Sequence, residues 1–283
     1  MTAGSSGPTR TSWIDVPGGR LAADDHGDPT APPIVLVHSA VVNRRAWDGV
    51  VPPLVEAGYR VITYDMRGYG ESTSEDVEFT GHGDLLAVLD HFRLERVAAA
   101  GNSMGAHFLL DAVLAAPARF VACAWVGGGI SGFDKEPSAT EQALFDAEEA
   151  AEEAADWDLA TEYDAQIWMD GPGQPATRVA PEARAAFKRM DRELLEPGRV
   201  YGQRQKTAVP AIGQLGSVRV PTLVVIGELD TVGTRAAAER VAADVPGARI
   251  VRLPNVAHIV GLEVPDELAA LILELVAPLP RWG

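Results

Sequence analysis

The sequence predicts an α/β fold with a mostly parallel central sheet, helices on both faces of the sheet, and one helical insertion. Its short apolar runs are continuous rather than alternating, which is typical of strands covered on both faces. Helical patterns lie between these runs, and alternating strands and helices indicate a parallel sheet. The alternation stops between about residues 131 and 214, where the pattern indicates helices without strands.

The expected elements follow in chain order. The predicted strands cover residues 34–37, 61–64, 97–100, 122–126, 222–226 and 250–253, the last being weakened by Arg252. The predicted helices between and after them cover residues 44–57, 84–92, 104–116, 234–243 and 265–276. Prolines at positions 52 and 53 restrict the first helix. Residues 12–16 and 20–24 are expected to form an antiparallel hairpin through Pro17-Gly18-Gly19.

Within the insertion, helices are expected at residues 140–154, 156–169 and 181–195, and Gly171-Pro172-Gly173 separates the last two. After Pro221 the strand–helix rhythm resumes. We therefore expect one α/β core, formed by residues 1–130 and 215–283, and a helical insertion of residues 131–214.

Charge limits the classes of partner. The 283 residues carry a formal net charge of −16, which argues against nucleic acid or an anionic membrane as a partner. Residues 134–164 contain twelve acidic residues and one basic residue. We expect a solvated helix face there rather than a cation site, because no acidic spacing matches a calcium loop. The single cysteine, Cys123, excludes an internal disulfide and a thiolate metal cluster and is expected to be buried.

No apolar stretch approaches the ~20 residues that span a bilayer; the longest, residues 268–279, is interrupted by Glu274. Residues 1–8 lack a basic region followed by an apolar stretch, so no signal peptide is predicted and we expect a cytoplasmic protein. The sequence makes no prediction about the oligomeric state.

The strongest functional pattern is at residues 101–105, which read Gly-Asn-Ser-Met-Gly. This G-x-S-x-G motif follows an apolar run and precedes a helical pattern. A serine on a tight strand-to-helix turn has its hydroxyl exposed above the sheet, and the flanking glycines remove side chains that the turn could not hold. Ser103 is therefore the candidate nucleophile.

A serine hydroxyl needs an adjacent base, usually an imidazole held by a carboxylate. Asp230 follows the strand predicted at residues 222–226, and His258 follows the next strand, so the order Ser103, Asp230, His258 is the one typical of this motif. Asp65 and Glu228 are weaker candidates for the acid. No set of histidines and acids has metal-ligand spacing, and we expect neither a metal nor an organic cofactor.

These motifs resemble those of the α/β-hydrolases, and the likeness covers nearly the whole chain. The loop that reads Asp-Met-Arg-Gly-Tyr-Gly-Glu-Ser at residues 65–72 and the Leu-Glu-x-Pro segment at 262–265 add to it. The resemblance implies that residues 131–214 form a cap, or lid. It also implies that the Ala40 and Met104 amides form the oxyanion hole. The family usually has His-Gly in this turn, whereas this chain has His38-Ser39, so we expect Ser39 either to restrict the turn or to offer its hydroxyl to the substrate.

Aromatic residues are few, and those of the insertion invite two interpretations. Trp168 and Met169 either pack the cap onto the core or line a substrate pocket. The stretch of residues 168–172 resembles part of the lid in ester- and lactone-cleaving members of the family. We expect Ser39, Trp168 and Met169 to take part in substrate binding.

The function that follows is hydrolysis of a small apolar carboxylic ester or lactone through an acyl-enzyme on Ser103. Two alternatives remain open. The Gly-Asn-Ser-Met-Gly motif also resembles that of hydrolases that cleave a carbon–carbon bond in dienoic ring-cleavage products, although Ile259 stands where a tryptophan would be expected. A ligand-binding protein without catalysis can share the same fold. In each case the partner is a small molecule.

Overall fold

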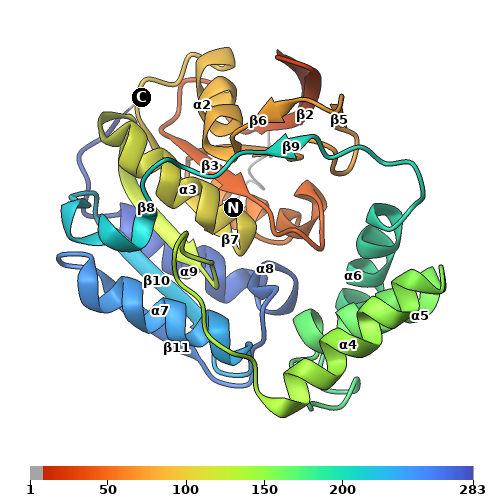
Figure 1. Ribbon diagram of the computed structural model, residues 1–283. Helices are drawn as coiled ribbons and strands as arrows, with labels where there is room; N and C mark the ends of the chain where they lie inside the picture. Colours follow the sequence, from red (N-terminus) through yellow and green to blue (C-terminus); the bar gives the residue numbers. More distant parts are fainter. Residues whose placement is uncertain (1–8, 283) are drawn as a thin grey trace, which may run out of the picture.

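A computed structural model of the chain describes residues 9–282, and its central feature is a nine-stranded mixed sheet (Figure 1). The main path of strands has the order β1-β2-β4-β3-β7-β8-β10-β11, with β5 paired to β2. The β1–β2 and β2–β4 pairs are antiparallel, and the pairs from β4 to β11 are parallel. The predicted fold class and the N-terminal hairpin are confirmed. Residues 1–8, on which the signal-peptide prediction rests, lie outside the described residues.

The strands of the main sheet are β1 (Arg10–Val16), β2 (Gly19–His26), β3 (Pro33–Val37), β4 (Arg60–Tyr64), β5 (Thr73–Ser74), β7 (Val97–Asn102), β8 (Phe120–Val126), β10 (Thr222–Gly227) and β11 (Arg249–Leu253). The core helices are α1 (Val51–Glu56), α2 (Gly81–His91), α3 (Met104–Ala115), α7 (Val232–Asp244), α8 (Val260–Glu263) and α9 (Pro265–Val276). Short 3₁₀ turns lie at η1 (Arg44–Trp47), η2 (Pro117–Arg119), η4 (Ala211–Gly213) and η5 (Leu215–Ser217).

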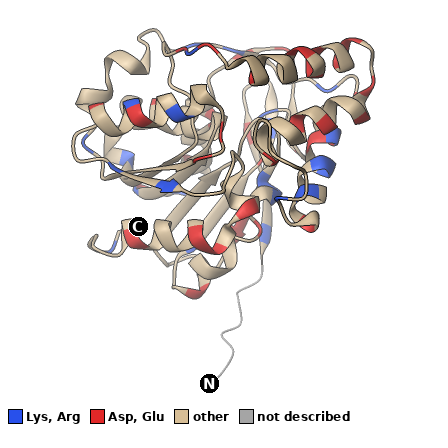
Figure 2. Ribbon diagram, turned by 90° about the horizontal axis from the view of Figure 1, so that it is seen from below, with Lys and Arg blue, Asp and Glu red and all other residues tan. Residues whose placement is uncertain are grey.

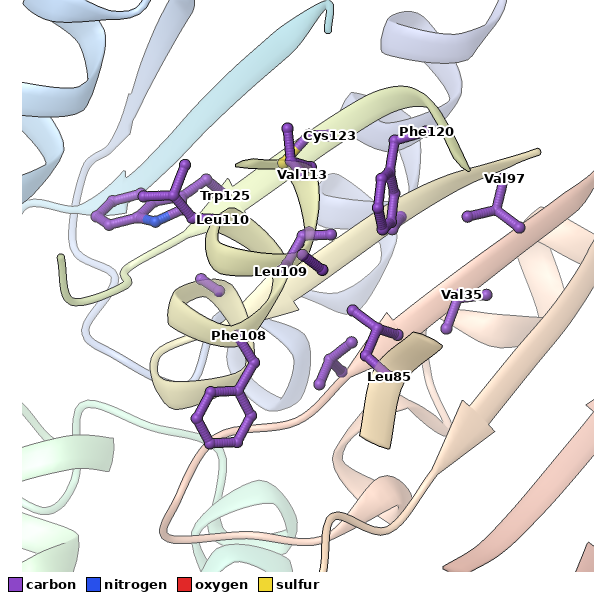
Figure 3. Packing of buried hydrophobic residues seen from close by; sticks show 14 of the residues in the cluster. Val35, Leu85, Val97, Phe108, Leu109, Leu110, Val113, Phe120, Cys123 and Trp125 are labelled. Carbon is purple, nitrogen blue, oxygen red and sulfur yellow. The ribbon is translucent and has the colours of Figure 1, made fainter. Parts of the chain in front are cut away.

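Helices cover both faces of the sheet, which explains why its apolar runs are continuous. Val35 and Val37 of β3 belong to a buried cluster with residues of α2, α3 and α7. Ile34 and Leu36 belong to the cluster on the other face, with residues of α1 and α9. Successive side chains of a strand point to opposite faces, so a strand buried on both sides needs apolar residues at every position. Figure 3 shows the first cluster, in which Cys123 is buried as expected.

Two expectations about local structure need correction, whereas the weaker strand expected at residues 250–253 is confirmed as β11. The predicted helix at residues 44–57 is divided into η1 and α1. The two prolines lie in the first turn of α1, where a backbone N–H would have no acceptor within the helix, so their lack of an N–H costs no hydrogen bond. The pair β6 (Glu78–Phe79) and β9 (Gln203–Arg204) forms a separate two-stranded sheet. The insertion therefore contains a strand, too short for its periodicity to be read. Arg252 fits because β11 is an edge strand, where it pairs with Glu239.

The chain between β8 and β10 forms α4 (Ala139–Glu153), α5 (Trp157–Asp164), the π-helical turn η3 (Ala165–Met169) and α6 (Pro181–Leu194). These helices lie together at one side of the core (lower right in Figure 1). They contribute no strand to the nine-stranded sheet. Across residues 9–282, no helix is both long and apolar enough to cross a membrane.

Candidate active site

Ser103 lies on a sharp turn between β7 and α3. Its backbone has φ 55° and ψ −115°, a conformation that residues other than glycine rarely adopt. A Cβ atom on Gly101 would lie 2.5 Å from backbone atoms of Gly105, and one on Gly105 would lie 2.3 Å from the Val37 carbonyl oxygen. Both motif glycines are therefore required by the close approach of strand, turn and helix. Strain of this kind is retained where it positions a functional side chain.

The structure brings Asp230 and His258 together. The Asp230 Oδ2 atom lies 2.8 Å from His258 Nδ1, and both side chains are buried. A carboxylate only accepts hydrogen bonds, so Nδ1 donates and Nε2 is left as an acceptor, which is the tautomer that a general base requires. Asp230 Oδ1 accepts from the Thr231 N–H at 2.7 Å, which fixes the carboxylate.

Asn102 connects the serine turn to the histidine loop. Its Nδ2 atom donates to the carbonyl oxygens of Val126 and His258, each at 3.1 Å. The residue before Ser103 is thus bonded to the backbone of His258. The three predicted residues follow the carboxyl ends of β7, β10 and β11, which lie side by side with β8 between β7 and β10. The sequence motif did not reveal this role of Asn102, because it depends on a contact across 156 residues.

The proposed oxyanion turn after β3 is held by His38, which is fully buried. His38 Nε2 accepts from the Met66 N–H at 2.9 Å, and Nδ1 donates to the Ser39 carbonyl at 2.7 Å. Burial lowers the pKa of His38, which favours the neutral ring that this acceptor needs.

Within residues 9–282 the Ala40 N–H donates to no protein group. The Met104 N–H is the first of α3, and such N–H groups have no partner within a helix.

The three residues expected to bind the substrate lie in different surroundings. Trp168 is half-buried, and its ring centroid lies 4.7 Å from that of His258. Ser39 is buried and its hydroxyl has no hydrogen-bond partner. Met169 is fully buried in a cluster with Val42 and Phe187. We correct that expectation: Met169 packs the insertion onto the core and presents no surface to a ligand.

The two weaker candidates for the acid lie elsewhere. Asp65 accepts from the Arg44 N–H at 2.8 Å and from the Glu71 N–H at 2.9 Å, and it also pairs with the buried Arg44 guanidinium. Glu228 is exposed. Neither carboxylate bonds to His258, so Asp230 is the acid that the geometry supports.

Two cavities adjoin the turns that carry Ala40 and Met104. One, of about 290 Å³, is lined mainly by apolar and aromatic side chains, among them Tyr69, Met104 and Phe108. The other is a groove of about 660 Å³ that begins at Ala40 and runs between the insertion helices. Tyr201 lines both cavities. Across residues 9–282, no group of three or more His, Cys, Asp or Glu side chains is placed to hold a metal ion.

Residues 34–271 match the model of the alpha/beta hydrolase family, and the chain belongs to this family. It is 29% identical over 285 residues to the rhodomycin D methylesterase of Streptomyces peucetius, covering 89% of this chain and 93% of that one. It is 36% identical to the 2-hydroxy-6-oxononadienedioate/2-hydroxy-6-oxononatrienedioate hydrolase of Cupriavidus pinatubonensis over 121 residues, 40% of this chain and 41% of that one.

Among solved structures, the enol-lactonase from Burkholderia xenovorans superposes with a TM-score of 0.74 at 21% identity, covering 94% of this chain and all of that one (100%). A likeness at this identity shows the fold. The family match and the methylesterase relative support a hydrolase enzyme. The alternative of a binding protein without catalysis is thereby disfavoured.

Proposed function

We propose that the protein is a serine hydrolase that cleaves a carboxylic ester or lactone with an apolar part, through an acyl-enzyme on Ser103. The observation that carries this proposal is the buried Asp230–His258 hydrogen bond of 2.8 Å beside a strained serine turn. The methylesterase relative, which matches along most of both chains, favours ester cleavage.

In the proposed reaction, Ser103 Oγ attacks the carbonyl carbon while His258 Nε2 accepts the hydroxyl proton. The negative charge moves to the carbonyl oxygen, where the Ala40 and Met104 N–H groups donate to it. The tetrahedral intermediate collapses, the bond to the leaving oxygen breaks, and His258 gives its proton to that oxygen. A water molecule then attacks the acyl-enzyme while His258 Nε2 accepts its proton. The second tetrahedral intermediate collapses, the bond to Ser103 Oγ breaks, and His258 returns the proton to Oγ as the acid is released.

We further propose that residues 131–214 act as a cap over this site. Trp168 of the insertion contacts His258 through its ring, and the His258 N–H donates to the Trp168 carbonyl oxygen at 3.3 Å. The apolar cavity of about 290 Å³ beside Met104 has room for a small apolar part of the substrate.

Covalent labelling by a fluorophosphonate, read by intact mass, tests the nucleophile. We expect one adduct on the wild-type chain and none on Ser103→Ala. A panel of esters and lactones, compared by kcat/KM, then identifies the substrate class. An unlabelled wild-type chain that also hydrolyses no member of the panel would refute the proposal.

Cleavage of a carbon–carbon bond in a dienoic diketo acid is the second candidate. It is favoured by the Gly-Asn-Ser-Met-Gly motif and by the partial match to the Cupriavidus hydrolase. Ile259, which is fully buried among cap and core side chains, stands where the resemblance leads us to expect a tryptophan. Including such a diketo acid in the panel distinguishes the two reactions, since a higher kcat/KM for it than for every ester would favour the second.

A further inference from the structure

The groove that begins at Ala40 is acidic along its length. Its walls come from α4, α5, α6 and the segment that follows α6, and acidic residues recur on the helices of the insertion (Figure 2). The carboxylates that line it are those of Glu148, Glu152, Glu153, Asp164, Asp191 and Glu196. Arg199 is the single cationic side chain in the lining, and its Nη1 donates to the carbonyl oxygens of Gly68 and Gly70 at 2.9 and 3.1 Å. The Nη1 group is therefore bonded to backbone oxygens outside the acidic set.

These carboxylates lack positive partners. Within residues 9–282, none of the six forms an ion pair with a lysine, arginine or histidine. By contrast, Glu162, on the same stretch of helix as Asp164, is paired with Arg184 and Lys188. Glu162 is thus neutralised, whereas the six carboxylates of the groove lining have no such partner among the described residues.

Asp191 gives an independent indication of a ligand. Its side chain is only 2% exposed, it lines the groove, and its Oδ2 atom makes no hydrogen bond. A buried carboxylate oxygen without a partner is costly, and proteins normally satisfy such atoms. Asp164, on the facing helix, is 7% exposed and accepts from Trp168 Nε1 at 2.9 Å. The solvated face expected from the sequence is therefore wrong for this carboxylate.

Burial and neighbouring negative charge raise the pKa of Asp164, of Asp191 and of Glu148, the last to about 7. An N–H donor with a positive charge would reverse both causes, since it supplies hydrogen bonds and opposes the repulsion. An anion would be repelled. A divalent metal is disfavoured, because no three acids or histidines among residues 9–282 are placed to ligate one.

We propose that the substrate carries a protonated amino group, which binds in this groove between Asp191 and Glu148 while its ester lies at Ser103. This inference rests on the proposed function and adds a substrate class to it. Trp168 connects the two regions, because its indole N–H bonds to Asp164 and its ring contacts His258. The ester end of the substrate lies near Ala40, and the ammonium lies deeper, among the insertion helices.

The test compares esters in isosteric pairs that differ in charge. Methyl esters of ω-aminoalkanoic acids of increasing length are paired with the alkanoate esters in which a methyl group replaces the ammonium. Aminoalkyl and alkyl esters of one short acid form a second series, which places the charge on the leaving side. We expect at least one series to show a kcat/KM about tenfold or more higher for the amine, equivalent to about 1.4 kcal/mol.

Asp191→Asn and Glu148→Gln should each reduce this ratio toward one. Glu149→Gln is the matched control: it removes the same charge from the same helix at an exposed position outside the groove lining, and the ratio should persist. Circular dichroism checks that each variant is folded, and Glu148→Gln, at a half-buried position, provides the result if Asp191→Asn does not fold.

Equal kcat/KM values within every pair in the wild type would overturn the proposal, as would a preference that survives in both groove variants. If neither member of any pair is hydrolysed and the fluorophosphonate does not label Ser103, the proposed function itself fails. If neutral esters are hydrolysed without a preference for amines, only the amine proposal fails.

Discussion

The indole ring of Trp168 packs against the imidazole of His258, with ring centroids 4.7 Å apart and planes inclined by 48°. The His258 N–H also donates to the Trp168 carbonyl oxygen at 3.3 Å. The insertion thus contacts the proposed catalytic base through both side chain and backbone. A residue in this position restricts the orientation of the imidazole.

Replacing Trp168 with alanine should change selectivity more than chemistry. The substitution removes an apolar wall beside His258, so we expect a higher KM and a shift in preferred acyl size of about tenfold or more in the ratio of kcat/KM values. Fluorophosphonate labelling of Ser103 should be retained. Trp168→Phe is the control, because it keeps an aromatic ring while it loses part of the indole bulk and the N–H that bonds to Asp164. An Ala variant that unfolds, with unchanged selectivity in its folded fraction, would show that Trp168 serves packing alone.

Ser103→Ala should abolish turnover and leave the fold intact. The turn holds a side chain at φ 55° in either protein, so alanine adds no new strain. If Ser103, His258 and Asp230 act as a unit, kcat should fall by a factor on the order of 10⁶. Steady-state kinetics and thermal unfolding of both proteins check the two halves of this expectation. Turnover close to that of the wild type would exclude Ser103 as the nucleophile.

We expect Asp230→Asn to lower kcat and Asp65→Asn to lower the free energy of unfolding. Asp230 holds the His258 tautomer, so its amide variant should lose kcat while remaining folded. Asp65 pairs with Arg44, which is 3% exposed, and removal of one partner from a buried ion pair costs about 3 kcal/mol. Asp65→Asn should therefore lower the free energy of unfolding and change kcat little in its folded fraction.

Urea unfolding and kcat, measured on both variants and the wild type, test this separation. Arg44 also pairs with Asp24 and Glu71, which limits the loss of stability in Asp65→Asn. The opposite ranking, in which Asp65→Asn is folded and inactive while Asp230→Asn remains active, would move the catalytic acid to the earlier loop.

Much of the fold could be predicted from the sequence, because strands buried on both faces need continuous apolar runs. The serine turn was predictable because Gly101 and Gly105 are required by backbone contact. The acidic groove was not predictable. Asp164 and Asp191 lie 27 positions apart on separate helices, and their local spacing resembles that of exposed acids. Only the packing of α5 against α6 buries them together.

The buried pair of Asp164 and Asp191 should give the protein a distinctive dependence of stability on pH. Burial raises the pKa of both carboxyls above the ordinary value of about 4, and the negative charges of Asp191 and Glu152 at Asp164, and of Glu148 and Glu152 at Asp191, act in the same direction. The folded state then binds more protons than the unfolded state above that pH, so this pair's contribution to stability falls as pH rises through the folded-state pKa values.

Asp164→Asn, which keeps an acceptor for Trp168 Nε1, should unfold at a higher urea concentration than the wild type at about pH 9 and show a smaller difference at about pH 5. Asp146→Asn, at an exposed position of α4, should follow the wild type at both values. Identical pH dependence in the wild type and Asp164→Asn would mean that Asp164 carries its charge at no cost to the fold.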